Sequence, residues 1–445
     1  MTETSALPVV VIGAGPIGLA AATHLRERGL DAVVVEAGER AGASVREWSH
    51  VRLFSPWSEL VDPAARKLLV AGGWHEPGPD AYPTGGEWAD SYLQPLADAL
   101  GSIRYRTRVT GVARHGRDVL VDSARDTEPF AVHLQTPQGP ERLLARSVID
   151  ASGTWSGPNP LGADGLPALG ETSRSDRITY RIPDFRDLAV RARYAGKHVA
   201  VAGTGASAQT VLIELGALAR SEAGTRVSWL VRRSRGGEAF GGGDNDQLPE
   251  RGALGTKAKQ VAAGETVTTI PRFRTASVDQ QDDGRLTLTA VDGQQVFDVD
   301  QVIAVTGFRP DLSILSEVRL DLDPVLSSPR VLAPLIDPNV HSCGTVYPHG
   351  AKELEQPEHG LFVVGMKSYG RAPSFLALTG FEQVRSVVAE IDGDHEAAAR
   401  VELTLPETGV CGGSGLFDEA EASGGGCCAA PASPELVTIG RPAER

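Results

Sequence analysis

The stretch GAGPIG near the start of this chain has the spacing of a turn that holds phosphates. It places Gly13, Gly15 and Gly18 in G-x-G-x-x-G register. The first glycine permits a tight turn, the second lets the backbone approach a pyrophosphate, and the third lets a helix lie close to a strand. Glu36 follows 23 positions after Gly13, where a carboxylate can accept both hydroxyls of a ribose. These residues predict a dinucleotide site.

A second stretch, GTGASA, repeats the pattern 190 positions later with Gly203, Gly205 and Ala208. The strand expected after its helix ends in Arg232 and Arg233 instead of an acid. A guanidinium group pairs with a phosphate through two parallel hydrogen bonds, whereas a carboxylate repels it. This favours NADPH over NADH at the second site. The alternative is that both arginines lie at a solvated strand end.

Each of these turns needs a strand before it and a helix after it, and the sequence supplies both. Residues 8–12 (PVVVI) form a β-branched run, the segment up to Gly29 has helical spacing, and DAVVVEAG indicates the next strand. Residues 197–233 repeat this order. Later strands are expected in RSVIDASGTW, QVIAVTGFRP and LFVVGM, the last of them leading into a helix over FLALTGFEQVRSVVAEI. The predicted fold class is α/β, with two Rossmann-like dinucleotide-binding units.

Thiols form the second group of residues that could do chemistry. The four cysteines of the chain are Cys343, Cys411, Cys427 and Cys428. The last three fall in a tail, from about residue 406, whose Gly, Ala, Ser and Glu content predicts flexibility. Thiolates select soft ions such as trivalent arsenic, so these three form a candidate metalloid site. Cys343 is the candidate receiving thiol, or alternatively a small buried hydrophobic residue.

Composition narrows the function classes. Lys plus Arg number 43 against 57 Asp plus Glu, a net charge of −14 that argues against broad binding to nucleic acid or membrane surfaces. No apolar run reaches the roughly 20 residues that span a bilayer. The apolar N-terminus lacks the basic region of a signal peptide. Cysteines without framework spacing suit a reducing compartment. We therefore expect a cytoplasmic protein with a small-molecule partner.

A first unit with a glutamate and a second with arginines resembles the two-dinucleotide flavoproteins, over roughly residues 5–400. DASGTW and AVTGFRPD are similar to the strands that join the two domains of that superfamily. The resemblance implies FAD at the first site and NADPH at the second. It also implies an FAD-binding domain made of residues 1–165 and 306–400, an inserted NADPH-binding domain at 190–305, and a tail at 406–445.

The motifs and the resemblance together imply two sets of contact residues. The residues expected to bind FAD are Gly13, Gly15, Pro16, Ile17, Gly18, Glu36, Ala37, Val109, Ser152, Gly153, Gly365 and Met366. The residues expected to bind NADPH are Gly203, Thr204, Gly205, Ala206, Ser207, Ala208, Arg232, Arg233, Thr306 and Gly307.

Within the superfamily the chain is most similar to flavin monooxygenases, and specifically to flavoproteins encoded in bacterial arsenic-resistance clusters. The similarity rests on RLFSPW (52–57), HSCGTVYPHGAKEL (341–354) and VGMKSYGRAPSF (364–375). By motif placement these stretches supply the candidates for the reaction pocket. They are Arg52, Trp57, His341, Cys343, Lys367 and Arg371.

Two departures from relatives bear on the chemistry. Disulfide reductases of the superfamily carry a cysteine pair soon after the first unit or inside the second, and here RAGASVREW and residues 195–330 contain none. Because this cysteine pair is missing, a relay from flavin to a protein disulfide is not expected. The F-x-G-x-x-x-H-x-x-x-W/Y fingerprint of classical flavin monooxygenases is also absent.

Three hypotheses follow from these residues. The first is an NADPH- and O2-consuming flavin monooxygenase that acts on a trivalent arsenical. The second is a monooxygenase for a small organic nitrogen, sulfur or carbon substrate, with an incidental tail. The third is a metalloid-binding flavoprotein with little turnover. A homodimer is the candidate assembly.

Overall fold

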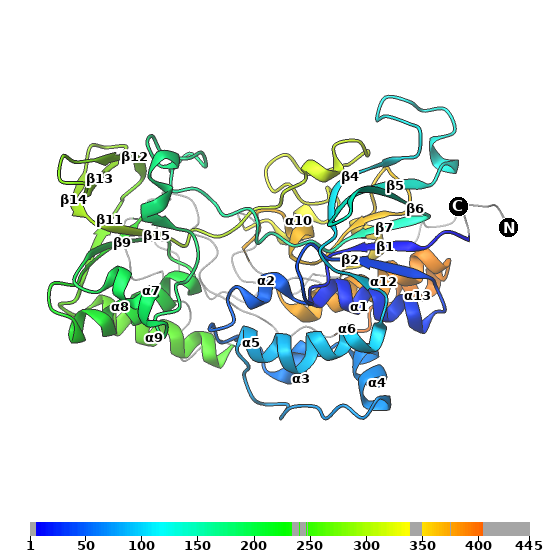
Figure 1. Cartoon of the computed structure of the whole chain (residues 1–445), viewed down its shortest axis with the longest axis horizontal. Helices are drawn as coiled ribbons and strands as arrows, with labels where there is room; N and C mark the ends of the chain where they lie inside the picture. Colours follow the sequence, from blue (N-terminus) through cyan, green and yellow to red (C-terminus); the bar gives the residue numbers. More distant parts are fainter. Residues whose placement is uncertain are drawn as a thin grey trace, which may run out of the picture.

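The computed structural model describes residues 6–233, 240, 246, 248–338, 349–373 and 375–403. Two units lie side by side, and each is built on a parallel β-sheet (Figure 1). The chain forms most of the first unit, passes into the second, and returns to add the last strand and helices of the first. The predicted fold class, α/β with two dinucleotide-binding units, is confirmed.

The first sheet has its strands in the order β16-β7-β1-β2-β3, all parallel. These strands are β1 (Val9–Ile12), β2 (Ala32–Val35), β3 (Ile103–Arg104), β7 (Ser147–Asp150) and β16 (Leu361–Val363). Ile12, Asp150 and Val363 are register partners, so three strands end level with one another. The turn that contains Gly13 begins at this edge.

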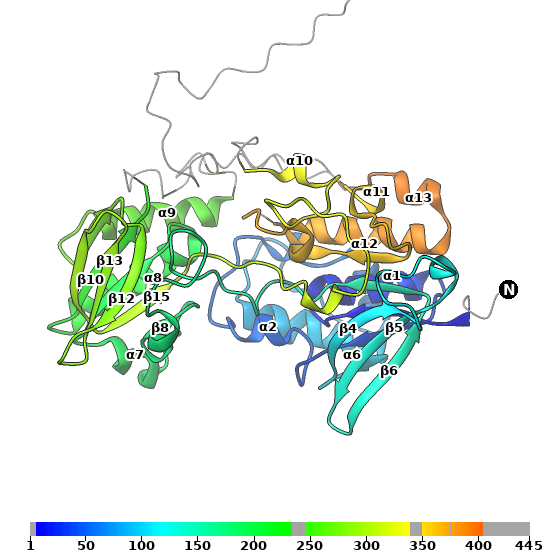
Figure 2. The same cartoon turned by 90° about the horizontal axis from the view of Figure 1, so that it is seen from above.

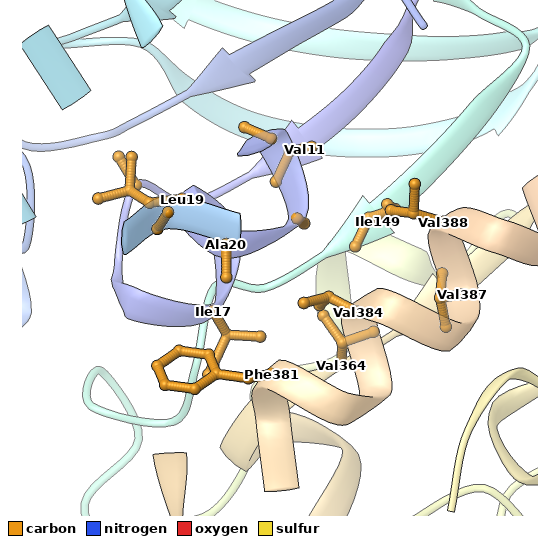
Figure 3. Packing of buried hydrophobic residues seen from close by; sticks show 14 of the residues in the cluster. Val11, Ile17, Leu19, Ala20, Ile149, Val364, Phe381, Val384, Val387 and Val388 are labelled. Atoms are coloured by element: carbon orange, nitrogen blue, oxygen red, sulfur yellow. The ribbon is translucent and has the colours of Figure 1, made fainter. Parts of the chain in front are cut away.

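The run VVVI is buried at every position because β1 is covered on both faces. Val9 and Val11 belong to a core shared with helices α1 (Pro16–Glu27) and α12 (Ala377–Asp392), seen from close by in Figure 3. The alternate residues face a three-stranded antiparallel sheet. Its strands are β4 (Arg108–Arg114), β5 (Phe130–Thr136) and β6 (Gly139–Ala145).

The second unit repeats this layering. Its parallel sheet has the order β11-β10-β9-β15-β8, with Val199 and Val201 of β9 packed toward helix α8 and Ala200 and Ala202 toward an antiparallel sheet. The parallel strands are β8 (Ile178–Thr179), β9 (His198–Ala202), β10 (Arg226–Val231), β11 (Val267–Pro271) and β15 (Gln301–Ala304). Around them lie α8 (Ala206–Ser221), α9 (Pro249–Ala262), β12 (Thr275–Gln280), β13 (Leu286–Ala290) and β14 (Gln295–Val299).

Two antiparallel segments connect the units, as the view in Figure 2 shows. The Asn159 N–H donates to the Gly307 carbonyl at 2.9 Å, and the Arg309 N–H donates to the Gly157 carbonyl at 2.8 Å. The rings of Trp155 and Phe308 stack with centroids 4.7 Å apart. The predicted domain boundaries remain a prediction.

The remaining helices are short. They are α2 (Ala43–Arg46), α3 (Trp57–Leu60), α4 (Pro63–Ala71), α5 (Gly85–Trp88), α6 (Gln94–Leu100), α7 (Leu188–Tyr194), α10 (Ala333–Ile336), α11 (Ala351–Leu354) and α13 (His395–Ala399). Within the described ranges, no helix combines the length and the apolar character that crossing a bilayer requires.

Candidate functional site

The first glycine turn has one side packed and one side open. Gly13 has φ +101°, and a Cβ there would lie 2.9 Å from the Ala151 carbonyl oxygen. A Cβ at Gly18 would lie 1.9 Å from the carbonyl oxygen of Gly13. At Gly15, by contrast, no atom lies within 4 Å of the Cβ position. Gly15 also caps α1 without a side-chain hydrogen bond, so the N–H groups of the first turn face the same open side. A pyrophosphate fits this arrangement.

Glu36 is held in place by the backbone of the turn. Its Oε2 accepts the Ala14 N–H at 2.8 Å and its Oε1 accepts the Gly38 N–H at 2.7 Å. The Thr107 N–H donates to the Glu36 carbonyl at 2.8 Å, which brings the start of β4, and with it Val109, to the same end of the sheet. A carboxylate fixed in this way keeps lone pairs for the two hydroxyls of a ribose. Ala37 beside it is exposed.

The second glycine turn has the same geometry. Gly203 has φ +125°, and a Cβ there would lie 2.3 Å from the Val305 carbonyl oxygen. Gly205 has no atom within 4 Å of its Cβ position and caps α8 without a side-chain bond. Ala208, at the third position of the motif, is buried. The residues Thr204, Ala206 and Ser207 complete this turn and the start of α8.

The two arginines follow β10, the strand next to β9 in the sheet, and the Arg232 side chain is exposed. Thr306 and Gly307 lie in the returning connection, where the Thr306 Oγ1 donates to the Asn159 carbonyl at 3.0 Å. Gly307 has φ +94°, a conformation that favours glycine. The predicted NADPH residues therefore lie on three segments at the carboxyl end of one parallel sheet, where open α/β sheets bind ligands.

Lys367 is buried in an ion pair. Its Nζ lies 2.7 Å from Asp150 Oδ2 and donates to Ser152 Oγ at 3.0 Å. Sequence reasoning treated Lys367 as a pocket candidate and missed Asp150, although DASGTW contains it. A charged residue in an otherwise apolar strand, SVID, was the available signal.

Gly365 is placed by α1 and α12. A Cβ at this position would lie 3.2 Å from Ile17 Cγ1, and the Gly365 N–H donates to Gln383 Oε1 at 2.7 Å. The Gln383 amide nitrogen donates in turn to Ser368 Oγ at 3.0 Å and to His349 Nε2 at 2.8 Å. The Gly365 N–H is thus used inside the protein, and its role, like that of Met366, as an FAD contact stays a prediction.

The other described pocket candidates lie in different surroundings. Arg52 donates to the Tyr82 carbonyl and lines a cavity of about 270 Å³ between the units, opposite Phe185 and Leu254. Arg371 is exposed, whereas Trp57 is buried in the first core.

The remaining predicted site residues lie outside the described part of the chain. They are His341, Cys343, Cys411, Cys427 and Cys428. Within the part that is described, no group of three or more His, Cys, Asp or Glu side chains could hold a metal ion.

Polar contacts near this cavity hold the two units together. Arg181 of the second unit pairs with Glu47 of the first, and its guanidinium lies 4.6 Å from the centre of the Trp155 ring. His50 Nε2 is 3.0 Å from the Ile182 carbonyl oxygen. The two dinucleotide turns therefore belong to units that contact each other directly.

Known proteins share this architecture. The chain is 25% identical to ferredoxin–NADP reductase 1 of Cupriavidus necator over 387 residues, which cover 86% of this chain and 88% of the relative. The structure of this chain is similar to that of a bacillithiol disulfide reductase from Bacillus cereus, with a TM-score of 0.64 and 20% sequence identity. The match covers 87% of this chain and 99% of the Bacillus cereus chain. It is also similar to the FAD-bound cadaverine monooxygenase of the desferrioxamine pathway from Erwinia amylovora, with a TM-score of 0.61 and 15% sequence identity. That match covers 90% of this chain and 98% of the Erwinia amylovora chain. The two structural likenesses show the fold.

The family profile described as pyridine nucleotide-disulphide oxidoreductase matches residues 10–329, which contain both glycine turns and most of the chain. Both turns are open at their second glycine, Gly15 and Gly205. This protein therefore belongs to the pyridine nucleotide-disulphide oxidoreductase family and is an oxidoreductase that uses FAD and NADP(H).

Proposed function

We propose that this protein is a flavin monooxygenase that oxidises a small molecule with O2 at the expense of NADPH. One observation carries the proposal: the region that matches the family, residues 10–329, contains no cysteine. Electrons from NADPH therefore cannot pass to a dithiol in this region and need another acceptor. FAD bound at the first unit would supply that acceptor, together with the reactivity of reduced flavin toward O2.

The chain's own residues would position the two cofactors. The open side of the Gly15 turn and the N-terminus of α1 would hold the FAD pyrophosphate, and Glu36 its ribose. The corresponding turn at Gly205 would hold the pyrophosphate of NADPH, with Arg232 available to its 2′-phosphate. The contacts of Arg181 and His50 across the interface hold the two units that carry these turns against each other.

Transfer of electrons to a protein carrier is the second candidate, because the similar Cupriavidus necator protein is named a ferredoxin–NADP reductase. The net charge of −14 disfavours an acidic carrier, since like charges slow the encounter of two proteins. A monooxygenase with a small neutral substrate is not subject to this repulsion. The two functions differ in the fate of O2.

As the substrate class we propose trivalent arsenicals. The support is the chain's own set of thiols, with three of four cysteines in the last 40 residues and two of them adjacent. Soft thiolates are the protein ligands that bind such ions. The competing proposals are an organic nitrogen, sulfur or carbon substrate, and a metalloid-binding protein with little turnover.

The test is NADPH consumption with and without arsenite or methylarsenite, using isotopically labelled O2 to follow oxygen into the product. We expect stimulation by an arsenical, labelled pentavalent product, and a raised KM in the Cys427→Ser/Cys428→Ser variant. Reduction of an artificial dye by NADPH serves as the control, because it reports both cofactor sites and should be equal in both proteins. No stimulation by any arsenical would refute the substrate, and ferredoxin-dependent turnover without label incorporation would refute the monooxygenase.

A further inference from the structure

A lysine and an aspartate are buried together at the edge of the first sheet where the FAD turn begins. Lys367 is 2% exposed and Asp150 is 0% exposed. Asp150 ends β7 and is level with Ile12, the residue before Gly13, while Lys367 follows the neighbouring strand β16. The Cβ position of Gly13 lies 2.9 Å from the carbonyl oxygen of Ala151, the residue after Asp150. The ion pair is therefore immediately next to the turn.

Stability alone explains this pair poorly. Removing two charges from water costs several kcal/mol per ion, and a pair of packed apolar side chains often serves a fold equally well or better. Ile12 and Val363, which end the strands on either side of β7 at the same level, are both apolar. Two charges at this one position of the edge therefore point to a ligand rather than to packing.

Ser152 connects the buried charges to the surface of the site. Its Oγ donates to Asp150 Oδ1 at 2.6 Å and accepts from Lys367 Nζ at 3.0 Å. Its N–H donates to the same Asp150 oxygen at 3.0 Å. Ser152 itself is exposed, whereas Asp150 and Lys367 are buried. Its hydroxyl and backbone are thus fixed by both charges.

We propose that Lys367 is a positioning residue for FAD, which holds Ser152 in place and offsets the charge of Asp150 beside the cofactor. A pyrophosphate brings two negative charges to the N-terminus of α1. Without a cation beside it, the Asp150 carboxylate would repel these two charges through the adjacent glycine turn. The Lys367 ammonium cancels that repulsion and leaves Asp150 free to orient the backbone of Ser152. The inference rests on the binding of FAD at the first unit.

The test compares the wild type with Lys367→Met, Asp150→Asn and the double variant. The readouts are the FAD dissociation constant from flavin fluorescence, the Tm of the FAD-free protein, and the midpoint potential of the bound flavin. In Lys367→Met we expect FAD to bind about 100-fold more weakly and the potential to fall, because an uncompensated carboxylate repels both the phosphates and the reduced flavin. In Asp150→Asn we expect FAD to bind at least as tightly as in the wild type and the potential to rise.

A structural pair would behave differently. Both single variants would then lower the Tm and weaken FAD binding to a similar degree, and the midpoint potential of the bound flavin would be the same in the wild type and all three variants. That pattern would overturn the proposal, whereas opposite effects of the two single variants support it. Glu358→Gln is a matched control, because it removes another buried ion-paired carboxylate and should lower Tm with the potential unchanged. None of these readouts uses a substrate, so failure here leaves the proposed monooxygenase untouched.

Discussion

Replacing Gly15 with alanine should weaken FAD binding without destabilising the fold. Gly15 has φ −80° and ψ −177°, an extended conformation that any residue adopts, and its Cβ position is free of neighbours within 4 Å. Alanine therefore fits the protein, and stiffening of the unfolded chain should add about 0.4–1 kcal/mol of stability. The same methyl group would occupy the space through which the turn approaches the pyrophosphate.

The expected loss of FAD affinity follows from the hydrogen bonds at stake. If the methyl group displaces the pyrophosphate from about two N–H groups, each worth about 1.5–3 kcal/mol to a charged acceptor, the loss is about 3–6 kcal/mol. This corresponds to a dissociation constant about 10² to 10⁴ times higher. Gly18→Ala provides the contrast, because its Cβ would lie 1.9 Å from the Gly13 carbonyl oxygen. Backbone must then move, at a cost of about 1–3 kcal/mol or more, and the Tm of the FAD-free protein should fall.

The assay is the Tm of the FAD-free proteins by circular dichroism, together with FAD titration followed by flavin fluorescence. Gly15→Ala should bind FAD weakly while its Tm stays at or slightly above the wild-type value, whereas Gly18→Ala should both bind FAD weakly and have a lower Tm. Gly205→Ala is the internal control, since it should retain FAD but slow its reduction by NADPH. A Gly15→Ala protein that binds FAD with wild-type affinity would refute the placement of the pyrophosphate on this turn.

Three further predictions concern other charged groups. Glu36→Gln should weaken FAD binding about tenfold or more, because an amide accepts the ribose hydroxyls less strongly than a carboxylate. FAD affinity is measured by fluorescence titration, and an unchanged affinity would contradict the assignment of the ribose to Glu36. Arg232→Glu should lower the preference for NADPH over NADH about 10- to 100-fold in kcat/KM, and an unaltered ratio would place the 2′-phosphate elsewhere. Burial raises the pKa of Glu358, but hydrogen bonds from Arg114 and Arg125 outweigh it and hold the pKa below its usual value of 4.5. The stability that this carboxylate contributes is thus present above pH 4.5 and is lost as the pH falls through the lower folded-state pKa. Glu358→Gln should lower the free energy of unfolding by about 3–5 kcal/mol at neutral pH and make it depend less on pH in the acid range. Urea denaturation at several pH values measures both effects.

The cofactor turns were accessible from sequence because each is a local feature. The order strand, glycine turn, helix occupies 19 consecutive residues in the first unit and 24 in the second. The run VVVI is apolar throughout because successive residues of a strand point to opposite faces and both faces of β1 are covered. In the structure Gly15 and Gly205 are open and the first glycine of each motif has a positive φ, while the contacts of these glycines with the cofactors stay predictions. The roles of the pocket candidates stay predictions. Trp57 lies in the core, and Lys367 lies in a buried ion pair.

The sequence by itself determined the two dinucleotide units and the absence of a dithiol in the matched region, because turn conformation, strand periodicity and residue type are all carried by neighbouring positions. Only the tertiary structure decided which distant residues meet. Lys367 and Asp150 are 217 positions apart and touch because β16 returns from the second unit to pair with β7. Gly365 has φ +68° and lies against Ile17 of α1, so both its backbone conformation and its surroundings favour glycine. Such contacts depend on the order of strands in the sheet, which no local pattern specifies.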